Sequence, residues 1–110
     1  PSIDLRTQVL KDIRGLLTPS GKLLMTNWKF DANDRLKQKI VPWSTVGIDE
    51  PLLEPGDALI AWKRGGAGYR YVHLIAPEEL ERLARETGFK TEKQFYADAG
   101  MNLYSVLGVL

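Results

Sequence analysis

Residues 5–28 read LRTQVLKDIRGLLTPSGKLLMTNW, and the order of patterns in this stretch decides the fold class. Apolar side chains recur at helical spacing while charged ones fall on other faces, which predicts an amphipathic helix over about residues 3–17. Pro19 cannot continue that helix, and Gly21 permits a tight turn. The apolar run that follows predicts a buried strand over residues 23–27. Helix, turn and buried strand in succession indicate an α/β protein.

The segment after this strand predicts a short helix and then a long irregular stretch. Residues 31–41, DANDRLKQKIV, look like a helix that is capped by Asp31 or Asn33 and ended by the following proline. Residues 43–56 carry so many prolines and glycines that an irregular loop region is expected there.

The remainder of the chain predicts a hairpin, a helix and two further strands. Two strand-like runs, residues 57–62 and 69–74, are joined by the glycine-rich KRGGAG, which is typical of a β-hairpin. Residues 77–87 predict a helix, because a proline opens the first turn, two glutamates complement the N-terminal dipole and a glycine follows the end. Residues 91–97 and 102–109 are strand candidates.

Length and composition indicate one ordered domain over residues 1–110. Hydrophobic residues make up 44% and charged residues 26% of the sequence, as in ordinary globular proteins. Because the net charge is only +1, any attraction to nucleic acid must come from a local cluster. The lack of cysteine suits a cytoplasmic protein, and a single histidine argues against a histidine-based metal site, so no metal is expected. No apolar run is long enough to span a membrane, so no membrane association is expected.

No familiar catalytic arrangement is recognisable, so the catalytic residues are unknown at this level. The glycine-rich loop joins two strands, whereas phosphate-binding loops lie between a strand and the N-terminus of a helix. A Ser-His-Asp triad could use only His73, and nothing in the sequence nominates its partners. Four carboxylates lie in or beside the loop region, where solvated charge is the ordinary state: Asp49, Glu50, Glu54 and Asp57.

Three pieces of the sequence are informative in their order: LRTQVLKDIRGLLTPSGKLLMTNW, APEELERLARETGF and KQFYADAGMNLYSVLGVL. Together they resemble the second half of a class I S-adenosylmethionine-dependent methyltransferase. In that family a helix leads through a proline-glycine turn into the fifth strand, a later helix ends in Gly-Phe, here Gly88-Phe89, and the last two strands form an antiparallel pair. Ser20 stands where a second glycine is usual. The resemblance implies a partial Rossmann-like fold with a mixed sheet, flanking helices and an inserted β-hairpin at about residues 57–74.

The resemblance also implies what these 110 residues do not contain. The family's glycine-rich first loop and the acidic residue that holds the cofactor ribose precede the matched region. We therefore expect S-adenosylmethionine to be the cofactor of the full-length family member. The isolated chain is expected to bind no cofactor, to contribute only substrate-side surface and to be inactive alone.

A narrower resemblance involves GDALIAWKR, YRYVHL and the Glu-Glu-Leu helix that follows them. These pieces are similar to the insert of tRNA wobble-uridine methyltransferases that act on carboxymethyluridine, which carry a "Val-Pro-Trp … Arg-Tyr-Tyr-His" arrangement. The resemblance implies that Trp62, Arg70, Tyr71 and His73 lie near substrate RNA, with Ala61 in place of the expected proline.

The hairpin admits two interpretations from its residues. Strand alternation places Tyr71 and His73 on one face and Arg70 on the other. These side chains either pack as ordinary cross-strand neighbours or stack on unpaired bases, with Lys63, Arg64 and Arg70 as phosphate contacts. In the second case the partner is RNA or a small-molecule methyl acceptor. A non-enzymatic RNA- or peptide-binding module that uses this hairpin is the alternative function.

Asn27 and Trp28 are further substrate-side candidates, because ligands of open α/β sheets bind outside the carboxyl ends of the strands. Packing of Trp28 beneath the following loop is the alternative. In the implied fold the strand of residues 23–27 lacks a neighbour, and an unpaired apolar edge favours pairing with a second chain. A homodimer through this exposed sheet edge is therefore expected.

Overall fold

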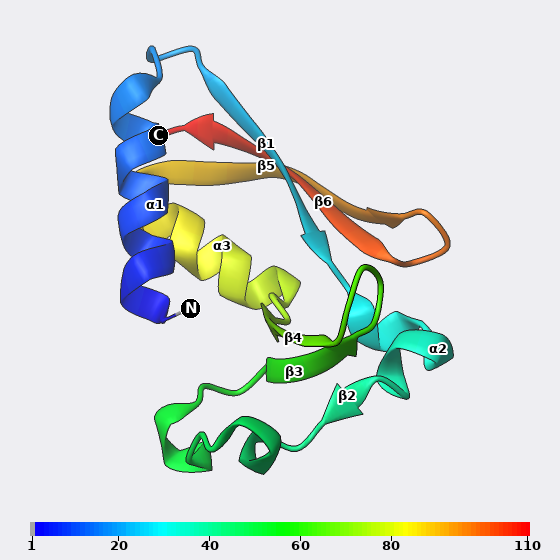
Figure 1. The fold of residues 1–110 in the computed structure, drawn as a ribbon. Coiled ribbons are helices and arrows are strands. Elements are labelled where there is room, and N and C mark those ends of the chain that lie inside the picture. The colour runs from blue at the N-terminus through cyan, green and yellow to red at the C-terminus, as the bar shows by residue number, and fades with distance from the viewer. Residues whose placement is uncertain (1) are drawn as a thin grey trace. The chain divides into compact units, whose positions relative to one another are not determined.

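A computed structural model describes residues 2–110 of the protein (Figure 1). The described chain divides into two compact units, each with its own sheet. One, the α/β unit, comprises Ser2–Lys29 and Ile75–Leu110, and the other, the insert unit, comprises Phe30–Leu74. None of the helices within residues 2–110 combines the length and apolar character needed to cross a bilayer.

The α/β unit contains α1 (Ile3–Leu16), β1 (Lys22–Trp28), α3 (Pro77–Glu86), β5 (Phe89–Ala97) and β6 (Asn102–Val109). The hydroxyl of Ser2 accepts a hydrogen bond from the backbone N–H of Leu5 at 3.3 Å and so begins α1. The two helices and three strands expected for these parts of the sequence are confirmed to within two residues at each end.

The sheet of the α/β unit has the order β1-β6-β5, and both strand pairs are antiparallel. Figure 1 shows β6, in red, between β1 and β5. The expected mixed sheet is therefore wrong for the described residues, because the two strands that run in the same direction are separated by β6 and do not pair. Within this sheet β1 is an edge strand, as expected.

The core of the α/β unit lies where α1 and α3 pack against one face of the sheet. The buried cluster consists of Leu10, Leu83, Ala84, Phe89 and Leu107. Successive residues of β1 point to opposite faces, so Leu23 and Met25 pack against this cluster while Leu24 is 72% exposed. The other face of the sheet therefore presents apolar side chains at its β1 edge.

The insert unit contains η1 (Phe30–Ala32), α2 (Asp34–Lys37), β2 (Ile40–Val41), η2 (Trp43–Val46), η3 (Glu50–Leu52), β3 (Asp57–Trp62) and β4 (Gly68–His73). Its sheet has the order β2-β3-β4, with antiparallel pairs throughout. Asn33, not Asp31, caps α2, because its Oδ1 accepts a hydrogen bond from the N–H of Leu36 at 3.2 Å. Ile60 at the centre of β3 is completely buried.

Residues 31–41 depart from the single short helix that the sequence predicts. Helix α2 ends at Lys37, and Ile40–Val41 become a strand because their backbones pair with Ile60 and Leu59 of β3. The predicted hairpin is confirmed, since β3 and β4 pair along their whole length. It belongs to a three-stranded sheet of its own and not to the sheet of the α/β unit. That residues 1–110 form a single domain stays a prediction.

Candidate functional site

Two cations lie near the indole ring of Trp62, the last residue of β3. The guanidinium carbon of Arg70 lies 4.5 Å from the centroid of the indole ring, and the Nζ of Lys39 lies 5.5 Å from it. The register of the hairpin explains the first contact, because Trp62 pairs with Gly68 and Arg70 is two residues further along β4, on the same face. Cations held over an indole ring are attracted by its quadrupole, each by about 0.5–2 kcal/mol.

Lys39 reaches this place through the backbone of the strand that the sequence does not predict. Its carbonyl oxygen accepts a hydrogen bond from the N–H of Ala61 at 2.9 Å, which extends the pairing of β2 with β3 by one residue. The side chain of Lys39 therefore starts beside the end of β3, next to Trp62.

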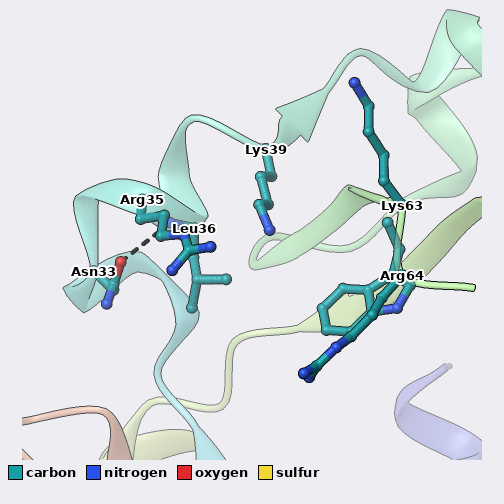
Figure 2. Close-up of a pocket in the computed structure, with 7 residues that line it drawn as sticks. Asn33, Arg35, Leu36, Lys39, Lys63 and Arg64 are labelled. Carbon is teal, nitrogen blue, oxygen red and sulfur yellow. Dashed lines mark hydrogen bonds between the residues drawn. The ribbon is translucent and has the colours of Figure 1, made fainter.

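A pocket of about 620 Å³ opens between α2 and the end of β3, entirely within the insert unit. It is lined by Asn33, Arg35, Leu36, Lys39, Trp62, Lys63 and Arg64. Four of these residues are cationic and none is a carboxylate. Figure 2 shows the side chains of Arg35 and Lys39 extending into the space between the helix and the hairpin, whereas Lys63 extends away from it. We call this site the basic pocket.

A second cluster centres on Asp57, the first residue of β3. Its Oδ1 accepts a hydrogen bond from the hydroxyl of Tyr71 at 2.6 Å and lies 2.6 Å from Nδ1 of His73. Its Oδ2 accepts a hydrogen bond from the backbone N–H of Glu54 at 2.9 Å. The side chains of Asp57 and His73 are only 5% and 7% exposed. Both carboxylate oxygens are therefore satisfied inside the unit.

These hydrogen bonds set the charge of Asp57. Burial raises the pKa of Asp57, but the hydrogen bonds from Tyr71, from the backbone of Glu54 and from His73 together outweigh it, so the pKa lies below the ordinary value of 3.8. Asp57 is thus ionised at neutral pH and can only accept hydrogen bonds. The Nδ1 of His73 therefore carries a hydrogen and donates it to Asp57.

The same cluster has the donor types of a metal site. Within residues 2–110, Glu54, Asp57 and His73 each offer one ligand atom, and these atoms lie within 4.8 Å of one another. A single histidine argues against a histidine-based site, whereas this mixed set of carboxylates needs only one histidine. The hydrogen bonds already made by both Asp57 oxygens favour a structural role for the cluster.

Trp43 joins this cluster through Tyr71, with ring centroids 6.0 Å apart and planes inclined by 47°. Trp43 also ends a Val-Pro-Trp run at residues 41–43. That Trp62 corresponds to the tryptophan of the "Val-Pro-Trp … Arg-Tyr-Tyr-His" arrangement stays a prediction.

The candidate residues of the hairpin thus divide between two faces of one sheet. Trp62 and Arg70 share one face, next to the basic pocket that Lys63 and Arg64 line. Tyr71 and His73 lie on the other face, opposite Leu59 and Asp57. Alternation along β4 is confirmed, but the pocket residues from α2 and the partner Asp57 were not predicted, because each depends on a long-range contact.

Asn27 and Trp28 belong to the α/β unit, where they form the end of β1 and pair with Leu103 and Asn102. The Oδ1 of Asn27 is buried and accepts no hydrogen bond from any of the described residues. Leaving a buried oxygen unsatisfied costs about 1–3 kcal/mol. Such a cost at the carboxyl end of a strand is consistent with a functional position.

Comparisons with known proteins support the fold. Neither a protein-family model nor a curated protein matches the chain. Among solved structures, the CcbJ methyltransferase from Streptomyces caelestis matches with a TM-score of 0.63 and 16% sequence identity. The match covers 97% of this chain but 54% of the methyltransferase, so the chain spans about half of that structure's length. At this identity the match shows a shared fold.

Proposed function

We propose that this chain is the substrate-side part of an S-adenosylmethionine-dependent methyltransferase and that a further polypeptide segment binds the cofactor. The observation that carries the proposal is the alignment of 97% of the chain with about half of a methyltransferase structure. The strand order β1-β6-β5 adds support, because its final antiparallel pair is the one that the sequence resemblance implies.

Binding of the acceptor by this chain and of the cofactor by another segment is compatible with the chemistry of methyl transfer. Direct displacement at the methyl group of S-adenosylmethionine depends on aligning the acceptor with that group, and aligned reactants gain about 7–11 kcal/mol from proximity alone. The chain's role in this proposal is to hold the acceptor. Its candidates are the basic pocket with Trp62 and, in the α/β unit, Asn27 and Trp28 at the end of β1.

The acceptor in this proposal is a uridine of RNA, as in the tRNA wobble-uridine methyltransferases that the insert resembles. The support comes from the contact between Trp43 of the Val-Pro-Trp run and Tyr71 of the Arg-Tyr-Val-His run. Two motifs separated in the sequence are thus neighbours in the insert unit. Asp57 holds Tyr71 and His73 in place by hydrogen bonds. These two residues therefore affect acceptor binding indirectly, by fixing the conformation of the hairpin.

Calorimetric titration with S-adenosylmethionine tests the proposal. The chain alone is expected to show no binding, and the chain combined with a cofactor-binding methyltransferase segment is expected to bind the cofactor and to transfer a labelled methyl group to RNA. Micromolar binding of S-adenosylmethionine to the 110 residues alone would contradict the assignment of the cofactor site to another segment.

A non-enzymatic RNA-binding module is the second candidate, and the basic pocket is the observation that favours it. RNA binding and methyl transfer, measured with and without a cofactor-binding partner, distinguish the two functions. A module binds RNA in the absence of any cofactor-binding partner and never supports methyl transfer, whereas a methyltransferase part becomes active once its cofactor half is present.

A further inference from the structure

We propose that the basic pocket binds a nucleotide of single-stranded RNA, with its phosphates held by Arg35, Lys39 and Arg64 and its base against Trp62. The proposed binding site includes Arg35 of α2 and Lys39 in addition to the hairpin candidates. It depends on the proposed function only where the bound nucleotide is called the methyl acceptor, since binding can be measured without methylation.

The pocket is positively charged because basic side chains gather around it, although the insert unit as a whole is neutral. The insert unit carries six basic and six acidic side chains, so its formal charges cancel. Four of the basic residues nevertheless gather around one cavity that no carboxylate lines. Ion pairs with the carboxylates of residues 2–110 are formed by none of the four pocket cations, Arg35, Lys39, Lys63 and Arg64. Like charges gathered in this way repel one another, and a bound anion relieves that repulsion.

The aromatic ring distinguishes a nucleotide from a simple anion. Trp62 lines the same cavity as the cations and is only partly exposed, with Arg70 and Lys39 over its ring. Single-stranded nucleic acids are bound by this pairing of positive groups for the backbone with aromatic rings for the bases. An acidic peptide would form ion pairs with the cations but would not stack on the indole ring. The cavity, about 620 Å³, lies within the size range of ligand sites.

The geometry also suits a ligand of extended form. The cations come from two directions, Arg35 and Lys39 from the α2 side and Arg64 from the hairpin side (Figure 2). Successive phosphates of one strand can contact the cations of both sides. Recognition of backbone charge with a stacked base is tolerant of sequence, so the pocket supplies affinity more than sequence discrimination.

The experiment is a fluorescence titration of the intact chain with a labelled oligouridylate of about ten nucleotides. If the pocket neutralises about three phosphates, the affinity falls roughly twentyfold between about 50 and about 200 mM salt. The variant R35A/K39A is expected to weaken binding and to reduce the salt slope by about 1.4. Trp62→Ala is expected to weaken binding roughly fivefold to 150-fold, with partial rescue by Trp62→Phe.

The matched control is K37A/R82A, which removes the same charge from exposed positions outside the pocket. It is expected to bind RNA like the wild type, and thermal melts establish that each variant is folded. Equal weakening by control and pocket variants overturns the proposal, because binding then follows net charge. Binding of polyglutamate in preference to RNA, or no binding of RNA at all, overturns it too.

Two further ligands identify the source of the nucleotide. Uridine monophosphate that competes as well as the oligomer supports the pocket chemistry and identifies a free nucleotide as the ligand, whereas competition by the oligomer alone supports RNA. Inorganic phosphate that competes equally well overturns the role of Trp62. Failure of these titrations leaves the cofactor titration unaffected, so the two proposals fail separately.

Discussion

The Nδ1 of His73 lies 2.6 Å from the Oδ1 of Asp57, across the ends of β4 and β3, and both side chains are almost fully buried. The same carboxylate oxygen also accepts the hydroxyl of Tyr71. Three side chains on one face of the hairpin thus meet at a single oxygen, and the chain's one histidine is used in this contact.

Acid is expected to weaken the insert unit through Asp57. Its pKa in the folded protein lies below the ordinary value of 3.8, so the folded state holds fewer protons than the unfolded chain in this range. The stabilisation is present above about pH 4 and is lost as the pH falls through the folded pKa. Urea unfolding measured from about pH 6 down to about pH 2 is expected to show this decline.

Asp57→Asn is expected to lower stability at neutral pH by about 1–3 kcal/mol, because two of its neighbours lose an ionised acceptor. It is also expected to flatten the acid slope. Asp49→Asn is the control, since Asp49 is exposed and its side chain caps no helix. An acid slope that is identical in Asp57→Asn and the wild type would show that another group controls the transition.

Gly56→Ala is expected to destabilise the same region by about 1–3 kcal/mol. Gly56 has φ = +94°, and a Cβ there would lie 2.9 Å from the carbonyl oxygen of Leu74 and 3.3 Å from the ring of His73. Gly68→Ala is the control, because its Cβ would meet nothing within 4 Å and its φ is not positive. Chemical denaturation measures both, and an equal response of the two variants would contradict the strain at Gly56.

Ala99→Gly is expected to stabilise the α/β unit by about 1 kcal/mol. Ala99 has φ = +57° in the turn between β5 and β6, a conformation that costs an alanine free energy and costs a glycine none. Ala97→Gly should have the opposite sign, since Ala97 is the last residue of β5 and glycine weakens strands. Midpoints of urea unfolding decide the sign of each change.

Leu24→Lys is expected to abolish self-association if the proposed homodimer forms through the β1 edge. Leu24 is 72% exposed on the face of β1 that turns away from the core, and a lysine on an edge strand opposes pairing with another chain. Leu52→Lys is the control, because Leu52 is at least as exposed as Leu24 but lies in η3. Sedimentation equilibrium compares them, and a wild type that stays monomeric at high concentration contradicts the dimer.

The elements that the sequence predicts well are those with local signals. Helix α3 begins at Pro77, places Glu78 and Glu79 in its first turn and is followed by Gly88 at φ = +90°, so each end has its own chemical cause. Strand β6 matches its predicted bounds because its run begins after a turn that contains Asp98 and Gly100, both at positive φ. Local patterns of this kind do not depend on the rest of the fold.

The elements that the sequence misses depend on distant partners. Two residues, Ile40–Val41, are too few to carry a strand pattern, and they pair only because β3 is available beside them. The basic pocket is hidden for the same reason, since Lys39 reaches Trp62 through that pairing. Asp57 looks like a solvated loop carboxylate in the sequence, and only the register of β3 with β4 places it opposite His73.

The position of β6 has a consequence for the synthesis of the protein. Both of its partners, β1 and β5, precede it in the chain, and they do not pair with each other. While the ribosome is still making residues before Asn102, β1 and β5 therefore expose unpaired strand edges. Chaperones can bind such edges. The sheet of the α/β unit therefore cannot form before β6 has been made, and a premature stop ahead of β6 removes both strand pairs of this sheet at once.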